Sequence, residues 1–337
     1  MNSVLRRLQA LLACCLLLAI AACSAGSSTK ESTTGAPAAS SGVWPRTITH
    51  KLGTTTIPSR PQRVVSTSMV LTGSLLAMDA PVIGTGASKP GAIGLDDQGL
   101  FTHWAPKAKE KGVKVLFKNQ QLDLEAITAA KPDLIYVSVT GGDSFADSYA
   151  QLARIAPTVA VDYNTVGWKE TVKELGASLG MEQQATDVVA DYDAKVSALK
   201  SKVKAPAEPV QMIVFNPSNG SAFAKPGGPH EAVLKDLGLT LDATDLDKLG
   251  TNEGGKGRGD FTFLSEENSI AALTAKTVLL VSGTEDDVRQ IKASTTYQKI
   301  PAAQADGRLV PLGLPSFKLD YYSALDMAEH LAKAFGA

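Results

Sequence analysis

The sequence predicts an α/β fold with two Rossmann-like lobes joined by a single long α-helix. Two observations lead to this prediction. In both halves of the chain, short apolar runs typical of buried strands alternate with amphipathic segments typical of helices. Between the halves, residues 182–204 contain neither glycine nor proline and carry apolar side chains at a helical period. We therefore expect an N-terminal lobe at 46–180, a linking helix at 181–205 and a C-terminal lobe at 206–337.

The first 22 residues resemble a bacterial lipoprotein signal peptide. Arg6 and Arg7 precede an apolar run, 8–22, that is too short to span a bilayer comfortably, and small residues stand directly before Cys23. Cleavage before Cys23, with lipidation of that cysteine, would leave a mature chain without any other thiol. The alternatives are a plain secretory signal or a short anchor helix. The next segment, 23–45, is rich in Ser, Thr, Gly, Ala and Pro, which predicts a flexible tether.

The charge balance of the chain is nearly neutral. It has 33 basic and 34 acidic residues, a formal net charge of −1, and loss of Arg6 and Arg7 with the signal peptide would make this −3. A nucleic-acid binder needs a basic face, so this balance argues against nucleic acid as a partner. The apolar content of 44% is ordinary for a globular protein with its own core.

The N-terminal half alternates strands and helices in the order of a parallel sheet. The run 133–139 is almost continuously apolar, and Pro132 stops the helix before it. The predicted strands are 63–66, 81–84, 133–139 and 158–161, and the predicted helices are 69–80, 122–131, 143–155 and 168–179.

A long linking helix is followed by a C-terminal half in which strands and helices again alternate. Acidic side chains lie in the first half of 182–204 and lysines in the second half, an order that complements the helix dipole, and Pro206 ends the helix. A helix of roughly 35 Å between two lobes predicts a stiff strut. The predicted C-terminal strands are 209–216 and 276–282, and the predicted helices are 229–237, 264–275 and 323–334.

The sequence contains no complete catalytic motif. The segment 250–257 has the glycine and lysine spacing of a phosphate loop but lacks the following Ser or Thr, there is no Gly-x-Ser-x-Gly, and the four histidines show no metal-ligand spacing. These observations favour a binding protein over an enzyme. Two alternatives stay open: a secreted hydrolase with a dispersed triad, and a cell-surface adhesin suggested by Arg258-Gly259-Asp260.

Several segments resemble the siderophore-binding proteins of ABC importers, and most specifically those that bind ferric enterobactin. The matching segments, in conserved order and spacing, are 48–84, 131–144, 151–158 and 316–324. The pattern from Glu125 to Ile135 is shared more widely, with haem and cobalamin binders of the same class, which remain the alternative. The resemblance implies a class III periplasmic binding protein fold with the ligand in the cleft between the lobes. It also implies ABC permease and ATPase subunits as partners. The lipid anchor on the extracytoplasmic face of the membrane is expected from Cys23 and its signal peptide, and it departs from the ferric enterobactin binder, which is a freely soluble periplasmic protein.

A ferric tris-catecholate carries a charge of about −3 on iron that is already fully coordinated. Its binding site needs cations and aromatic rings, with no metal ligands and no covalently bound cofactor from the protein. By resemblance, Arg258, Phe317 and Lys318 align with cleft residues of the family. Lys318 stands where we expect an arginine, so the positive charge is kept but the planar guanidinium group is lost. Further candidates lie on loops or at strand ends, where α/β folds present ligands: Phe223, Lys225, Lys256, Ser66, Thr67, Ser68, Thr140 and Gly141.

The family also predicts a docking surface for the permease, with one acidic residue on each lobe. By position we expect Asp147 and Glu267, although a solvated helix face explains each of them equally well. Tyr321 and Tyr322 stand at a predicted helix start, where packing is the preferred interpretation.

Overall fold

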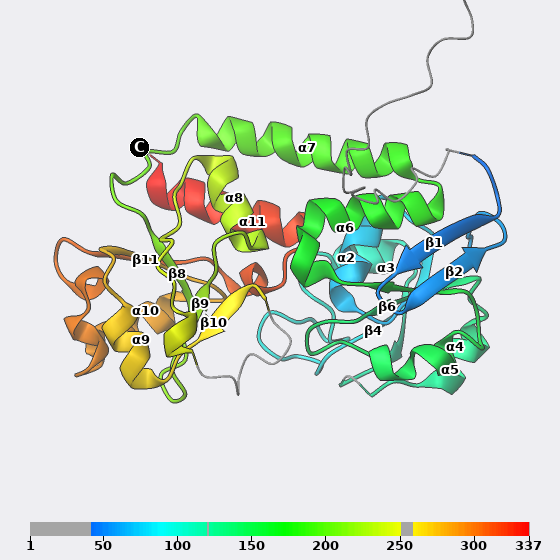
Figure 1. Ribbon diagram of the computed structural model, residues 1–337, viewed down its shortest axis with the longest axis horizontal. Helices are drawn as coiled ribbons and strands as arrows, with labels where there is room; N and C mark the ends of the chain where they lie inside the picture. Colours follow the sequence, from blue (N-terminus) through cyan, green and yellow to red (C-terminus); the bar gives the residue numbers. More distant parts are fainter. Residues whose placement is uncertain (1–41, 120, 251–258, 337) are drawn as a thin grey trace, which may run out of the picture. The chain divides into compact units, whose positions relative to one another are not determined.

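The computed structural model describes residues 42–119, 121–250 and 259–336, which belong to one compact unit. Two five-stranded sheets form the centres of the two predicted lobes (Figure 1). The predicted α/β class with two lobes and one linking helix is confirmed. No helix among the described residues is both long enough and apolar enough to cross a membrane.

The N-terminal sheet is entirely parallel, in the order β5-β4-β3-β6-β7. Its central strands β3 and β6 are buried on both faces, which is why their sequences read as continuous apolar runs. The strands are β3 (Val64–Ser66), β4 (Val82–Gly86), β5 (Lys114–Phe117), β6 (Leu134–Ser138) and β7 (Thr158–Val161).

Polar caps start the helices around this sheet. The side chains of Ser68, Asp123 and Asp162 accept hydrogen bonds from the first turns of α2, α4 and α6. The helices are α2 (Met69–Ala77), α3 (Ala105–Glu110), α4 (Leu124–Ala130), α5 (Tyr149–Leu152) and α6 (Tyr163–Leu179). The helix predicted at 143–155 is wrong in extent, because only the 3₁₀ turn η1 (Ala146–Ser148) and α5 form there. Gly141 has a φ of +78°, and the turn that it makes carries Asp143 away from a helix.

An antiparallel hairpin begins the first lobe and was not predicted. It consists of β1 (Arg46–His50) and β2 (Gly53–Ile57), and it packs on β7 at the edge of the sheet. Thr55 Oγ1 donates a hydrogen bond of 2.6 Å to the carbonyl of Thr158, which fixes the hairpin to that strand.

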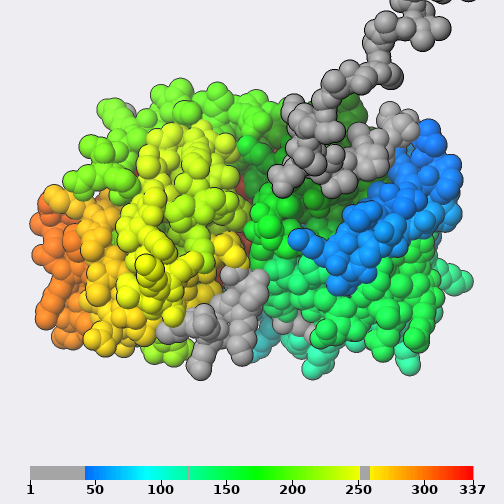
Figure 2. All heavy atoms as spheres, in the orientation of Figure 1, coloured from blue at the N-terminus to red at the C-terminus, as the bar shows by residue number. Residues whose placement is uncertain are grey.

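The linking helix α7 (Glu182–Lys200) has 19 residues and is about 28 Å long. It ends four residues before the predicted limit of 204. In Figure 1 it runs along the upper edge, above α6, α8 and α11, and it packs against all three. The space-filling view shows this helix in green beside both the green N-terminal and the yellow C-terminal lobe (Figure 2).

The C-terminal sheet is mixed, in the order β10-β9-β8-β11-β12. Its strands β8 (Gln211–Val214), β11 (Thr277–Leu280) and β12 (Arg308–Pro311) are parallel, whereas β9 (Ala222–Ala224) and β10 (Phe261–Phe263) are antiparallel. The helices are α8 (Pro229–Leu237), α9 (Glu266–Ala272), α10 (Glu285–Ala293) and α11 (Tyr321–Phe335), and the 3₁₀ turns are η2 (Asp247–Leu249), η3 (Tyr297–Lys299), η4 (Pro301–Ala303) and η5 (Leu314–Phe317).

One hydrophobic core runs through both lobes. Its buried side chains come from the N-terminal sheet and α2, from α6 and α7, and from α8, α11 and the C-terminal sheet. Smaller clusters fill the outer faces of the sheets. The lobes are therefore packed against each other through the helices on the α7 side, and the carboxyl ends of their parallel strands lead into the loops that form the pocket described next.

Candidate functional site

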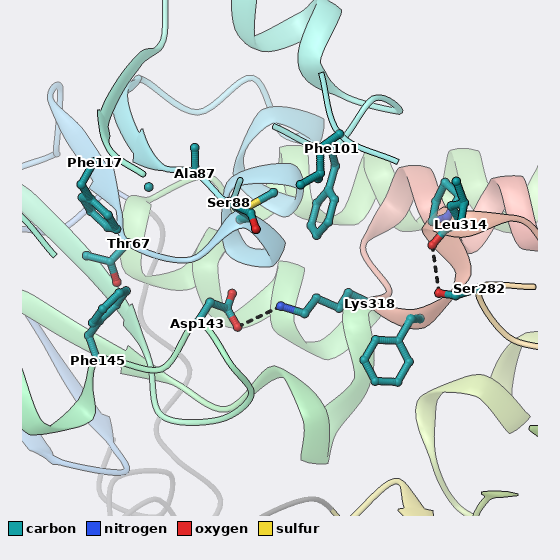
Figure 3. Close-up of a pocket in the computed structure, with 15 residues that line it drawn as sticks. Thr67, Ala87, Ser88, Phe101, Phe117, Asp143, Phe145, Ser282, Leu314 and Lys318 are labelled. Carbon is teal, nitrogen blue, oxygen red and sulfur yellow. Dashed lines mark hydrogen bonds and ion pairs between the residues drawn. The ribbon is translucent and has the colours of Figure 1, made fainter. Parts of the chain in front are cut away.

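A pocket of about 240 Å³ lies between loops of the two lobes (Figure 3). The N-terminal lobe contributes residues that follow β3, β4 and β6, the end of β5, and part of the 87–104 loop. The C-terminal lobe contributes Ser282 after β11 and the segment 314–318, which contains η5. Both sets lie at the carboxyl ends of parallel strands, where α/β sheets present their ligands.

Phenylalanine rings supply much of the apolar lining. Phe101, Phe117 and Phe145 come from the N-terminal lobe and Phe317 from the C-terminal lobe. The rings of Phe117 and Phe145 meet edge to face, with centroids 5.6 Å apart. The ring centroids of Phe317 and Phe261 are 5.7 Å apart, so one part of the Phe317 ring packs on Phe261 while another part lines the pocket. Such a lining suits flat, aromatic ligand groups.

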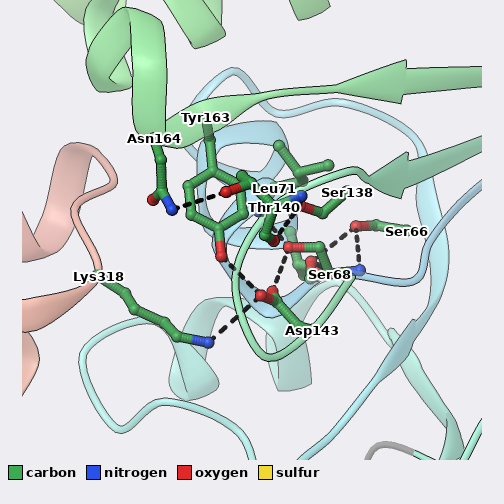
Figure 4. Close-up of polar contacts among 10 residues, drawn as sticks. Ser66, Ser68, Leu71, Ser138, Thr140, Asp143, Tyr163, Asn164 and Lys318 are labelled. Carbon is green, nitrogen blue, oxygen red and sulfur yellow. Dashed lines mark hydrogen bonds and ion pairs between the residues drawn. The ribbon is translucent and has the colours of Figure 1, made fainter. Parts of the chain in front are cut away.

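A buried carboxylate organises the polar side of the pocket (Figure 4). Asp143 is 4% exposed, and its Oδ1 and Oδ2 accept hydrogen bonds from Tyr163 Oη at 2.6 Å and from Ser68 Oγ at 2.5 Å. From the opposite lobe, Lys318 Nζ approaches Asp143 Oδ1 at 3.4 Å. Asp143 and Lys318 are the two charged side chains among the described residues that line the pocket.

The ends of β3 and β6 share one local structure. Ser66 Oγ donates to the carbonyl of Ser68, and Ser138 Oγ donates in the same way to the carbonyl of Thr140. These bonds turn the chain after each strand and set the positions of Ser68 and Thr140. Asn164 Nδ2 then donates to Thr140 Oγ1 at 2.8 Å, which ties the second turn to α6.

Thr67 differs from its neighbours because its hydroxyl is unsatisfied. The residue is 2% exposed and lines the pocket, yet Thr67 Oγ1 has no hydrogen-bond partner among the described residues. A buried hydroxyl without a partner is costly, so Thr67 Oγ1 would gain from a hydrogen bond to a ligand group that reaches it.

The structure brings some of the sequence-predicted residues together. Phe317, Lys318 and Thr67 line the pocket. Ser68 holds Asp143 in place, and a Cβ at Gly141 would lie 2.4 Å from Tyr163 Oη, so the glycine permits that close approach. Ser66 and Thr140 are buried and shape the turns.

Other predicted residues lie elsewhere or outside the described residues. Phe223 is 4% exposed and packs in a core cluster of the C-terminal lobe, so it is placed as a packing residue. Lys225 Nζ pairs with Asp247 at 2.8 Å and is not among the residues that line the pocket. Arg258, Lys256 and Cys23 lie outside the described residues.

The two acidic residues expected to dock a permease are both exposed. Asp147 lies in η1 of the N-terminal lobe and Glu267 in α9 of the C-terminal lobe.

The two tyrosines at the start of α11 were expected to pack. Tyr321 begins α11 and bonds to α7, accepting a hydrogen bond from Lys195 Nζ at 2.8 Å and donating one to Asp191. Burial raises the pKa of Tyr322 to about 12.

Sequence reasoning missed Asp143 and three of the phenylalanines. Asp143 was assigned to a helix, and only its contact with Lys318 across the pocket shows its position. Phe117 ends a strand, β5, that was not predicted, although the short apolar run 115–117 is compatible with one. Phe101 and Phe145 lie in irregular segments, where no periodic signal exists.

Comparisons with known proteins identify clear relatives. Residues 98–310 match the periplasmic binding protein family. The ferric enterobactin-binding periplasmic protein FepB of Escherichia coli is 38% identical over 303 residues, which cover 90% of this chain and 94% of that protein. The probable siderophore-binding lipoprotein YfiY of Bacillus subtilis is 31% identical over 176 residues, about half of each chain.

Solved structures agree with the fold. The crystal structure of holo-ViuP superposes with a TM-score of 0.79 at 30% identity, covering 88% of this chain and 96% of that one. Staphylococcus aureus SirA complexed with staphyloferrin B gives a TM-score of 0.63 at 24% identity, with 86% and 97% coverage, and supports the fold alone.

Proposed function

The chain belongs to the periplasmic binding protein family, and on that premise we propose that it binds a ferric siderophore for an ABC importer. The observation that carries the proposal is the pocket between the lobes, which combines four phenylalanine rings with Lys318 and the unsatisfied hydroxyl of Thr67. A ferric siderophore presents flat chelating groups and oxygen atoms around an iron that is already coordinated. Aromatic, cationic and hydroxyl groups bind such a ligand without contributing metal ligands.

We infer a ferric catecholate as the ligand class. FepB, which is named for ferric enterobactin, is similar over 90% of this chain. A tris-catecholate complex of charge about −3 would gain from Lys318 and, in our proposal, from Arg258 and Lys256. Catechol rings would stack against Phe101, Phe117, Phe145 and Phe317.

The proposed role in the cell is delivery and involves no covalent chemistry. Cys23 would carry a lipid that holds the protein on the extracytoplasmic face of the membrane, with 24–45 as a tether. Asp147 and Glu267 would meet the permease from the two lobes, and both are exposed as this role requires. Uptake in cells that carry charge reversals at both residues tests this part: a normal ligand affinity with lost uptake supports it, and unchanged uptake contradicts it.

Quenching of intrinsic tryptophan fluorescence tests the ligand class. Trp104 and Trp168 are buried in the described unit and report on it. We expect ferric enterobactin to quench at sub-micromolar concentration, and a ferric hydroxamate, haem and cobalamin to bind more weakly. Saturable binding of the hydroxamate alone would overturn the catecholate assignment while keeping the siderophore, and binding of haem or cobalamin alone would overturn both.

A further inference from the structure

The pocket contains a carboxylate that opposes the ligand charge the proposed function requires. Asp143 lines the pocket, is 4% exposed and is held by hydrogen bonds from Ser68 and Tyr163. These two donors come from the α2 N-terminus and from α6, so the position of the carboxylate is set by the scaffold. A buried, scaffold-held carboxylate is built into the site, unlike a mobile surface acid.

Asp143 also reduces the charge that Lys318 offers to a ligand. The Nζ to Oδ1 distance is 3.4 Å, and Asp143 is the only ion-pair partner of Lys318 within the described ranges. The described pocket lining therefore sums to zero charge, one lysine against one aspartate. An anion that approaches Lys318 must compete with a carboxylate that is already there, in a partly buried site where screening is weak.

We propose that Asp143 sets the ligand charge that the pocket accepts, by limiting the affinity for polyanionic ferric complexes. The penalty grows with the negative charge of the complex and vanishes for a neutral one. This inference rests on the proposed function, and the experiment below separates the two.

The experiment compares two ferric complexes of similar size and different charge. Ferric enterobactin carries −3, and ferrichrome, a tris-hydroxamate, is neutral. Titrations at low ionic strength would use the wild type, Asp143→Asn and Asp143→Ser. Both variants remove the charge. Asparagine keeps two polar atoms in reach of Ser68 and Tyr163, and the smaller serine serves if the asparagine variant folds poorly.

The matched control is Asp97→Asn. Asp97 lies on the 87–104 loop, which also lines the pocket, but it is exposed, and its side chain forms no ion pair or hydrogen bond with the rest of the described chain. It reports the effect of losing one negative charge on the same lobe at a residue that does not pair with Lys318.

We expect Asp143→Asn to tighten ferric enterobactin binding at least fivefold and to change ferrichrome binding less than twofold, with Asp97→Asn changing both less than twofold. If the wild type binds only ferrichrome, the catecholate assignment fails, but the charge argument then predicts measurable ferric enterobactin binding in the Asp143 variants. Equal changes for both complexes, no change, or an equal effect of Asp97→Asn would overturn the inference. A wild type that binds neither complex would overturn it together with the proposed function.

Discussion

At the scale of single residues, the pocket depends on a few side chains whose partners lie far away in sequence. Lys318 and Asp143 are 175 positions apart, and Thr67 lines the pocket while its buried hydroxyl has no partner in the described part of the chain. Lys318 is the described cation with direct access to a ligand, whereas Lys225 is occupied by Asp247. The hydrogen bond from Lys225 holds the pKa of Asp247 below its ordinary value, so their pairing persists at neutral pH.

Replacing Lys318 by glutamine should weaken the binding of ferric enterobactin about tenfold, a loss of ~1.4 kcal/mol. The variant loses the attraction to the anion and leaves Asp143 without its counter-charge. Fluorescence titration measures the change, and Lys292→Gln, an exposed residue on α10 of the same lobe, is the control. Equal affinity of the wild type and Lys318→Gln for ferric enterobactin would show that Lys318 does not contribute to ligand binding.

Replacing Thr67 by valine should separate binding from stability. The valine keeps the shape and removes a buried hydroxyl without a partner in the described structure, so the free energy of unfolding should stay equal or rise by up to about 1 kcal/mol. Ligand affinity should fall severalfold, because the pocket loses a hydrogen-bonding group. Urea unfolding and titration measure the two effects, with Thr67→Ser restoring binding. A loss of stability with normal affinity would show that the hydroxyl is structural.

At the scale of elements, the turns after strands β3 and β6 matter most. Each begins with a serine whose hydroxyl bonds two residues ahead, and the second contains Gly141 at a φ of +78°. The strands and long helices were predictable because their apolar periods are local in sequence. The hairpin β1–β2 and the strands β9 and β10 were not predicted, and α5 is shorter than the helix expected at 143–155, because packing on neighbours stabilises these elements more than local propensity does.

Replacing Gly141 by alanine should destabilise the protein by about 2 kcal/mol or more. A Cβ there meets Tyr163 Oη at 2.4 Å, in addition to the strain of a positive φ. Gly227→Ala is the matched control, because its φ is +81° and nothing lies within 4 Å of its Cβ, so it should cost only about 1 kcal/mol. Chemical denaturation measures both, and equal losses would mean that the contact with Tyr163 is easily relaxed.

At the scale of the whole molecule, polar and aromatic contacts join the lobes on the side of α7. Lys169 of α6 pairs with Asp193 of α7 at 2.8 Å and with Asp236 of α8 at 2.9 Å. The ring of Trp168 lies 4.7 Å from that of Tyr192 and 6.1 Å from that of Tyr321. Together with the shared core, these contacts support the interpretation of α7 as a strut.

Replacing Lys169 by methionine should destabilise the protein by roughly 1 kcal/mol at pH 7, because two partly buried ion pairs are lost. Burial lowers the pKa of Lys169, whereas the hydrogen bonds to Asp193 and Asp236 raise it. The increase is larger than the decrease, so the net shift of the pKa from 10.5 is upward. A lysine whose pKa is higher in the folded state than in the unfolded state stabilises the fold fully at any pH below its unfolded-state pKa. This stabilisation is lost as the pH rises through the folded-state pKa.

The difference between the wild type and Lys169→Met should therefore be constant near neutral pH and shrink above about pH 10.5. Urea unfolding at a series of pH values measures it. Lys173→Met, which breaks an exposed pair with Glu170 on the same helix, should change stability by less than about 0.5 kcal/mol. A difference that stays the same up to pH 11.5 would show that packing, and not charge, explains the loss.

The sequence by itself determined the α/β class, the two lobes and the linking helix, because periodicity and helix-ending residues act over a few positions. It also named Phe317, Lys318 and Thr67 as candidate ligand contacts, and all three line the pocket. Only the tertiary structure showed that Phe223 belongs to the core, that Lys225 is paired with Asp247, and that Asp143 faces Lys318. These facts depend on how side chains from distant segments pack against one another, and no local pattern in the sequence specifies that packing.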